Sequence, residues 1–92
     1  MPWASYRQAG RTGEAIGLLE RVVADSERLL GHDHPDTLTA RLHLAVSYWY
    51  AERRDEAIDL LLQVLADRER LLGHDHPDTR DAADALRSWR ML

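Results

Sequence analysis

Apolar residues recur at intervals of three and four positions in two long segments of the chain, with polar residues between them. This spacing gathers the apolar side chains on one face of an α-helix, so each segment is predicted to form an amphipathic helix. The apolar positions are Ala15, Leu18, Leu19, Val22 and Leu29 in the first segment and Ala57, Leu60, Leu61, Val64 and Leu71 in the second.

The two segments belong to an internal repeat. The string LLGHDHPDT occurs at 29–37 and again at 71–79, so a shift of 42 positions relates the copies. The similarity continues upstream, where EAIGLLERVVADSERLL from Glu14 aligns with EAIDLLLQVLADRERLL from Glu56. One unit, consisting of a long helix and the loop behind it, has been duplicated.

Each repeated loop carries the signals that end one helix and begin another. In the first copy Gly31 suits a left-handed residue at a helix end, Asp33 can cap free amides and Pro35 suits a first helical turn. The equivalent residues of the second copy are Gly73, Asp75 and Pro77. A partner helix is therefore expected after each loop.

Apolar stripes support the two partner helices. The first stripe comprises Leu38, Leu42, Ala45, Tyr48 and Trp49, and the weaker second one Ala82, Ala85, Leu86 and Trp89. The N-terminal residues align through the same shift with the end of the first partner helix. We predict an all-α protein without a sheet, with five helices near 2–10, 13–30, 35–52, 55–72 and 77–90.

These patterns resemble tetratricopeptide repeats of the 42-residue kind that is similar to kinesin light chain. The resemblance rests on the Gly, acidic and His-Pro residues of the loops, and on Leu44, Ala45 and Tyr48 in one helix followed by Ala57 in the next. It implies antiparallel helical hairpins stacked as a right-handed superhelix in a single domain. Residues 1–34 would be an incomplete first repeat, 35–76 a complete second repeat and 77–92 a terminal helix.

The resemblance also implies a function, because the concave face of such a stack is the usual binding groove. A peptide or partner protein is expected there, and no catalysis. The predicted contact residues are Arg7, Thr39, Leu42, Val46, Trp49, Tyr50, Asp84 and Ser88. Trp49 and Tyr50 are of the type enriched in binding hot spots, although both could instead be core residues.

Self-association is the alternative function. Trp3 stands where the family has a small residue, and Arg87 and Arg90 replace the small and aromatic residues of the last helix, which therefore resembles a terminal cap. Trp89, Met91 and Leu92 lie on or beyond a helix without a partner. We therefore expect a homo-oligomer, formed by contact or exchange of terminal helices.

Composition narrows the classes of partner. The 92 residues are 45% hydrophobic and 30% charged, as in folded soluble domains. The net charge is −4, and the 12 basic residues, all arginine, are spread along the chain, so nucleic acid is not an expected partner. No apolar run is long enough for a membrane span or a signal peptide, and a cytoplasmic location is expected.

Enzymatic and metal-dependent functions find little support. The strings His32-Asp33-His34 and His74-Asp75-His76 contain metal-ligand types, but helix capping explains them and the repeat keeps the two loops too far apart to share an ion. We interpret His34 and His76 as structural residues of the turns. The serines lack a nucleophile motif and no phosphate-binding loop is present, so no cofactor, metal or catalytic residue is predicted.

Overall fold

The computed structural model describes residues 12–91, and all the regular structure in that range is helical. The helices are α2 (Thr12–Leu30), α3 (Pro35–Tyr50), α4 (Arg54–Leu72) and α5 (Pro77–Met91). They confirm four of the predicted helices to within two residues at each boundary. The helix predicted near 2–10 lies outside the described residues.

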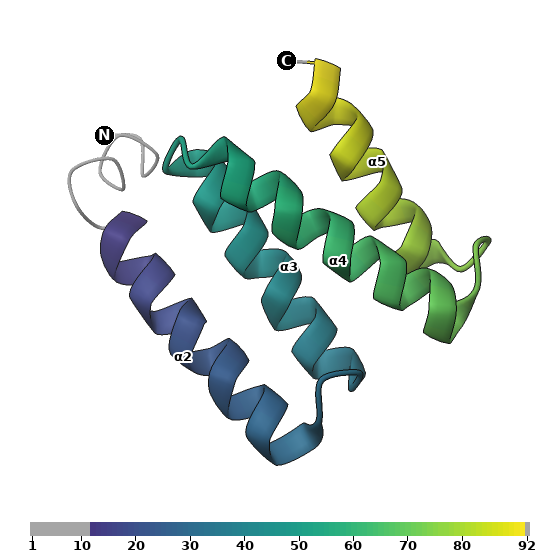
Figure 1. Ribbon diagram of the computed structural model, residues 1–92, viewed down its shortest axis with the longest axis horizontal. Helices are drawn as coiled ribbons and strands as arrows, with labels where there is room; N and C mark the ends of the chain where they lie inside the picture. The colour runs from purple at the N-terminus through teal and green to yellow at the C-terminus, as the bar shows by residue number, and fades with distance from the viewer. Residues whose placement is uncertain (1–11, 92) are drawn as a thin grey trace.

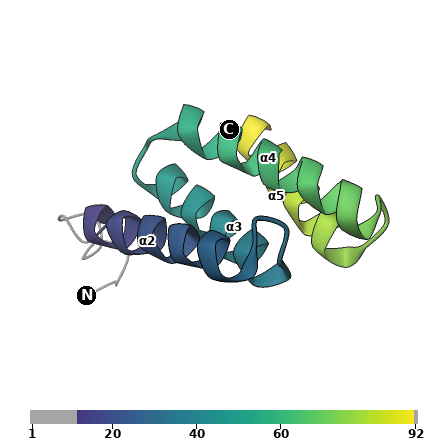
Figure 2. The same ribbon diagram turned by 60° about the horizontal axis from the view of Figure 1, so that its bottom comes forward.

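The helices run antiparallel to their neighbours in sequence, and substantial packing is confined to consecutive helices. Figure 1 shows α3 between α2 and α4, with α5 beyond α4. Figure 2 shows the two long corners that precede α3 and α5 toward the right, and the short turn after α3 toward the left. The helices therefore form stacked hairpins, which is the predicted all-α architecture.

The α3–α4 hairpin closes through a short turn that ends α3 at Tyr50, two residues before the predicted end. The amide of Glu52 donates to the carbonyl of Trp49 at 3.1 Å, and that of Arg53 to the carbonyl of Tyr48 at 2.9 Å. This is the Schellman pattern, which places its penultimate residue at positive φ. Glu52 occupies that position with φ 64°, so a non-glycine residue makes the turn.

The two long corners have the same backbone geometry. Gly31 and Gly73 adopt φ values of 96° and 91°, which confirms their predicted role at the helix ends. In each corner the histidine amide donates to the glycine carbonyl at 3.4 Å, for His34 and His76 alike. A duplicated sequence has thus produced a duplicated turn.

The cap of each partner helix differs from the prediction. The residue that caps α3 is His34, whose Nδ1 accepts a hydrogen bond from the amide of Asp36 at 3.1 Å. His76 accepts from Asp78 at the same distance. The structural interpretation of both histidines is confirmed. The expectation that Asp33 caps the helix is wrong, because its carboxylate turns toward α4 instead.

The core lies between α3, α4 and α5. Ala45, Leu61, Ala82 and Leu86 form a buried cluster in which the first three side chains are wholly or almost wholly shielded from solvent. Alanine on both α3 and α5 allows these helices to approach α4 closely, so that a leucine from α4 fills the space between them. Ala45 and Ala82, which the sequence placed on the apolar stripes of these two helices, thus lie in the core.

Candidate partner-binding face

The predicted contact residues of α3 lie partly on the surface and partly against the core. Thr39 and Tyr50 are exposed, and 56% of Tyr50 is accessible to solvent. Leu42, Val46 and Trp49 are half-buried, and Leu42 packs on the central cluster. Tyr50 is therefore a surface residue, whereas Leu42 contributes to both the core and the surface.

Two tryptophans form the most distinctive feature of this face. The rings of Trp49 on α3 and Trp89 on α5 stack with their centroids 4.8 Å apart and their planes within 4° of each other. The guanidinium of Arg54, at the start of α4, lies 4.9 Å from the Trp49 ring centroid. Three helices thus contribute to one aromatic and cationic cluster. Both tryptophans remain half-buried, so part of this apolar surface is accessible.

The short turn after α3 positions a second cation beside an aromatic residue. Arg53 lies 4.4 Å from the ring centroid of Tyr48, and it holds Glu56 through two hydrogen bonds of 2.8 and 2.6 Å. The Tyr48 hydroxyl donates to Glu20 of α2 at 2.8 Å. Burial and this hydrogen bond raise the pKa of Tyr48 from 10.0 to about 12, so the phenol stays protonated and continues to link α3 to α2 well into the alkaline range.

The predicted contact residues of α5 lie on its exposed surface. Asp84 is exposed, lies 3.4 Å from Arg87 and lines a groove between α4 and α5. Ser88, next to Trp89 in sequence, is also exposed. Arg7 lies outside the described residues. Because burial and position do not identify a ligand, all eight contact assignments stay predictions.

A network of charges joins the first corner to α4. Asp67 of α4 accepts a hydrogen bond from Arg41 of α3 at 2.7 Å and lies 3.2 Å from His32 of the corner. Arg70 of α4 donates to Asp33 at 2.8 Å. Only 3% of the Arg41 side chain and 19% of the Asp67 side chain are exposed. Sequence patterns alone gave no indication of this network.

The network changes the ionisation of Asp67. Burial opposes its charge, but hydrogen bonds from Arg41 and Arg70 outweigh that effect and hold the pKa of Asp67 below its usual value. Ligand-type atoms of His32, Asp33 and Asp67 lie within 4.8 Å of one another. Two guanidinium groups already neutralise these carboxylates, and we therefore interpret the cluster as an interhelix ion pair rather than a cation site.

Comparison with known proteins decides the family. The family model of the tetratricopeptide repeat matches residues 4–70. The chain belongs to the tetratricopeptide repeat family. Two solved structures of putative kinesin light chain nearly identical TPR-like repeats from Podosopora anserina, one of them a variant with a single substitution, superpose with TM-scores of 0.83. Their sequences are 33% identical for the variant and 32% for the other.

The match to these tetratricopeptide repeats covers nearly all of this chain but less than half of theirs. It spans 97% of this chain and 42% and 43% of the two solved chains. No curated protein matches the chain. The resemblance to the kinesin-light-chain type, stated from the HDHP corners and the Leu-Ala-Tyr pattern, is therefore confirmed. No helix within residues 12–91 is long and apolar enough to cross a bilayer.

Proposed function

We propose that this chain is a non-catalytic scaffold that binds a peptide or a partner protein on the face formed by α3 and α5. Tetratricopeptide repeats generally mediate protein–protein interactions, which supports the general class. The observation that favours this face is the half-buried Trp49–Trp89 stack, with Arg54 on one side and exposed Tyr50 next in sequence. Rigid aromatic surface beside a cation suits an apolar side chain close to a carboxylate.

A selection of peptides tests this proposal although the natural ligand is unidentified. Peptides are selected from a random library on the 92-residue chain, and their affinities are measured by titration calorimetry. Tyr50→Ala should weaken the selected peptides by about tenfold or more, as expected for a hot-spot aromatic residue. Leu29→Ala is the control, because Leu29 is 70% exposed at the far end of α2.

Two results would contradict the proposal. One is a selection that yields no peptide with measurable affinity. The other is a set of peptides whose affinities are unchanged by Tyr50→Ala and by Arg54→Ala, because such peptides would bind elsewhere on the molecule. Loss of binding with Leu29→Ala as well would indicate a fold defect, which a far-UV circular dichroism spectrum of each variant detects directly.

Self-assembly is the second candidate function, and exposed apolar residues at both ends of the described stack favour it. Leu18 and Val22 of α2 are 59% and 47% exposed, and Met91 of α5 is 78% exposed. Apolar residues that face solvent on the outer helices of a repeat stack are typical of surfaces that another chain covers. Light scattering over a range of concentrations tests this, since a molecular mass that stays at one chain contradicts it.

A further inference from the structure

The middle of the molecule shows how a corner receives the second helix of a hairpin. α4 lies beside the first corner, where Asp67 approaches His32 at 3.2 Å and Arg70 binds Asp33 at 2.8 Å. The two α4 residues are three positions apart and lie on one helical face. Each copy of the corner is therefore complementary to a helix that carries an aspartate followed, three residues later, by an arginine.

The second corner has the same residues but lacks these contacts within the described chain. His74 pairs only with Glu69 of its own α4, at 3.3 Å, and 86% of its side chain is exposed. Asp75 is exposed as well. The complementary helix that α4 provides to the first corner has no counterpart at the second among residues 12–91.

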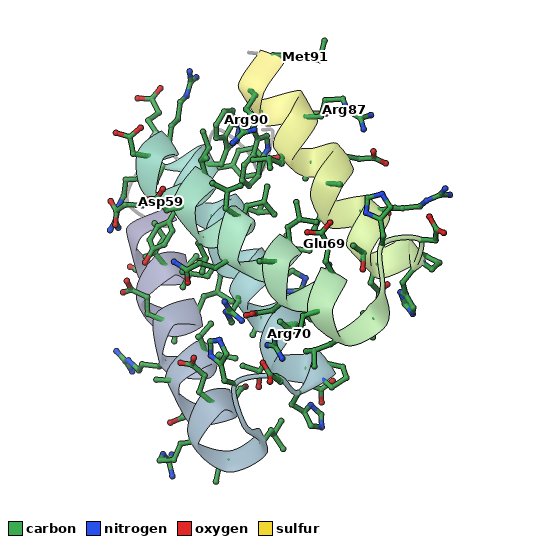
Figure 3. All side chains as sticks on the ribbon, turned by 45° about the vertical axis from the view of Figure 1, so that its right-hand side comes forward. Asp59, Glu69, Arg70, Arg87, Arg90 and Met91 are labelled. Atoms are coloured by element: carbon green, nitrogen blue, oxygen red, sulfur yellow. The ribbon has the colours of Figure 1, made fainter. Side chains whose placement is uncertain are left out.

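A groove extends from this second corner along α4 and α5. Its first part, of about 410 Å³, lies beside the corner, and an adjoining apolar hollow of about 360 Å³ reaches the end of α5. Both parts share Leu65, Ala83 and Arg87. Figure 3 shows Arg87 on the outer side of α5 and Met91 at the C-terminal end of the helix.

The repeat indicates that this groove corresponds to the surface on which the second helix of a hairpin packs. Ala83 and Arg87 stand 42 positions after Arg41 and Ala45, which α4 covers so fully that they are 2% and 0% exposed. The corresponding face of α5 is open, but the large and small residues are exchanged: Ala83 stands where α3 has Arg41, and the exposed Arg87 stands where α3 has Ala45. An incoming helix therefore meets the arginine one helical turn further along than in the α3–α4 hairpin. The stack therefore presents a first helix, α5, whose hairpin partner is missing from the described residues.

α2 has the opposite property, since it is a second helix with an exposed hairpin face. Val22 aligns with Val64 of α4, yet Val22 is 47% exposed and Val64 is fully buried. Asp25 and Arg28 of α2 stand at the positions of Asp67 and Arg70, and they pair only with each other, at 2.9 Å, within the part of the chain that the structure describes. α2 thus carries an aspartate and an arginine at the spacing that would complement the second corner.

We propose that α2 of one copy occupies the groove between α4 and α5 of another, so that α5 and the incoming α2 complete a hairpin between two chains. In the register of the α3–α4 hairpin, Asp25 reaches His74 and Arg28 reaches Asp75. Val22 then covers the apolar part of the groove near Leu65. This inference rests on the second candidate function above and specifies its surfaces, and it does not depend on the peptide site.

Charge at the other end of the groove fits the same register. Arg90 of α5 stands at the position of Tyr48, which Glu56 of α4 approaches closely enough to affect its ionisation. Glu14, the acidic residue in the first turn of α2, aligns with Glu56. An incoming α2 therefore places Glu14 near Arg90. A helix from another protein that carries only acidic residues could pair with Arg90 at this end. It would lack the arginine that pairs with Asp75 at the corner.

The two surfaces in this contact are different, and this determines the form of the assembly. A contact between unlike surfaces leaves one free face at each end of an open complex, so that further copies add in the same direction until the rotation between copies closes a ring. We expect a molecular mass that rises with concentration beyond that of a dimer. A molecular mass that stays at one chain over the whole concentration range would overturn the proposal.

Complementation between two defective variants tests the unlike surfaces. Val22→Glu disables the α2 face and Ala83→Glu the groove, so that each variant alone should be monomeric in sedimentation equilibrium. An equal mixture should form a complex of two chains and no larger species, because one intact contact remains. A mixture that stays monomeric overturns the proposal. Ala66→Glu, at an exposed position of α4, is the matched control and should assemble as the unmodified chain does.

A charge exchange tests the register and leaves the apolar residues unchanged, so that it remains informative if Val22→Glu fails to fold. Arg28→Glu and Asp75→Arg should each weaken self-association by about tenfold or more, because each variant places like charges opposite one another. The double variant should recover the affinity of the unmodified chain. Assembly without this recovery overturns the register while self-assembly stands. An unmodified chain that remains monomeric at about 1 mM overturns both.

Discussion

The two HDHP corners have nearly the same sequence and the same backbone, yet their side chains have different surroundings. At the first corner α4 supplies Asp67 and Arg70, and the ion pairs hold three segments of the chain together. At the second corner His74 reaches only its own helix within the described residues. The difference teaches that the local sequence determines the turn, while the neighbouring helix determines whether the turn contributes to the stability of the stack.

The two copies should differ most in how much stability is lost when the aspartate of the second helix, Asp67 or Asp25, is removed. Asp67→Ala leaves Arg41 buried without its partner, and breaking such a pair lowers the free energy of unfolding by about 3 kcal/mol. Asp25→Ala, at the same position of the first copy, removes only an exposed pair and should change it by less than about 0.5 kcal/mol. Urea denaturation followed by circular dichroism measures both. Equal effects would show that the network does not stabilise the fold.

Acid should weaken the first corner through the same carboxylate. Because the pKa of Asp67 is lower in the folded chain than its usual value of 3.8, its contribution to stability is complete above that pH and is lost as the pH falls through the folded pKa. The urea midpoint should therefore decline in this acidic range. Asp67→Asn should make the decline shallower, and an unchanged slope would contradict the role assigned to this group.

Substituting the corner glycines should affect the two copies equally. Gly31→Ala and Gly73→Ala each place a side chain at positive φ, although there is open space for the added methyl group. The expected loss is about 1–3 kcal/mol of unfolding free energy in each case, because the strain is in the backbone: positive φ with an extended ψ, 161° at Gly73, is a conformation that only glycine adopts readily. Thermal unfolding of the two variants tests this, and a clear difference between them would mean that the two turns are not equivalent.

The smallest expected effect on the free energy of unfolding comes from two buried threonines at equivalent positions, which differ in their hydrogen bonds. The Thr79 hydroxyl donates to the carbonyl of Arg68 at 3.3 Å, whereas the Thr37 hydroxyl has no hydrogen-bond partner among the residues that the structure describes. Thr79→Val should lower the free energy of unfolding by about 1 kcal/mol, and Thr37→Val should leave it unchanged or raise it. Urea denaturation of both variants measures these changes. A larger loss for Thr37→Val than for Thr79→Val would contradict the hydrogen-bond assignment.

The elements of the fold were predictable from the sequence because the features that specify them are local. Gly31 and Gly73 end helices through their own backbone freedom, and apolar spacing indicates the buried face of α4. The same spacing does not do so for α2, where Leu18, Val22 and Leu29 are exposed. The end of α3 was misplaced since Glu52 adopts positive φ without being glycine. The cap was assigned to Asp33 since aspartate is the commoner capping residue, and its interaction with Arg70 depends on a helix 37 positions away.

The candidate site was less predictable because its defining contacts cross between helices. Trp89 aligns with Ser47 rather than with Trp49, so the repeat gave no indication that the two indoles would stack. In the sequence, the spacing of Asp67 and Arg70 fits an ordinary surface pair. Only the position of α3 against α4 reveals that Asp67 meets the buried Arg41.

Substantial packing is confined to consecutive helices, and this has a consequence for how such a molecule can grow. A further duplication of the 42-residue unit after α5 would require new neighbours for that helix alone, while every contact among α2, α3 and α4 stayed as it is. Length can thus change in gene duplication without redesign of an interior. For the same reason, loss of an end unit leaves the remaining units with their original neighbours, apart from the one helix that is newly exposed.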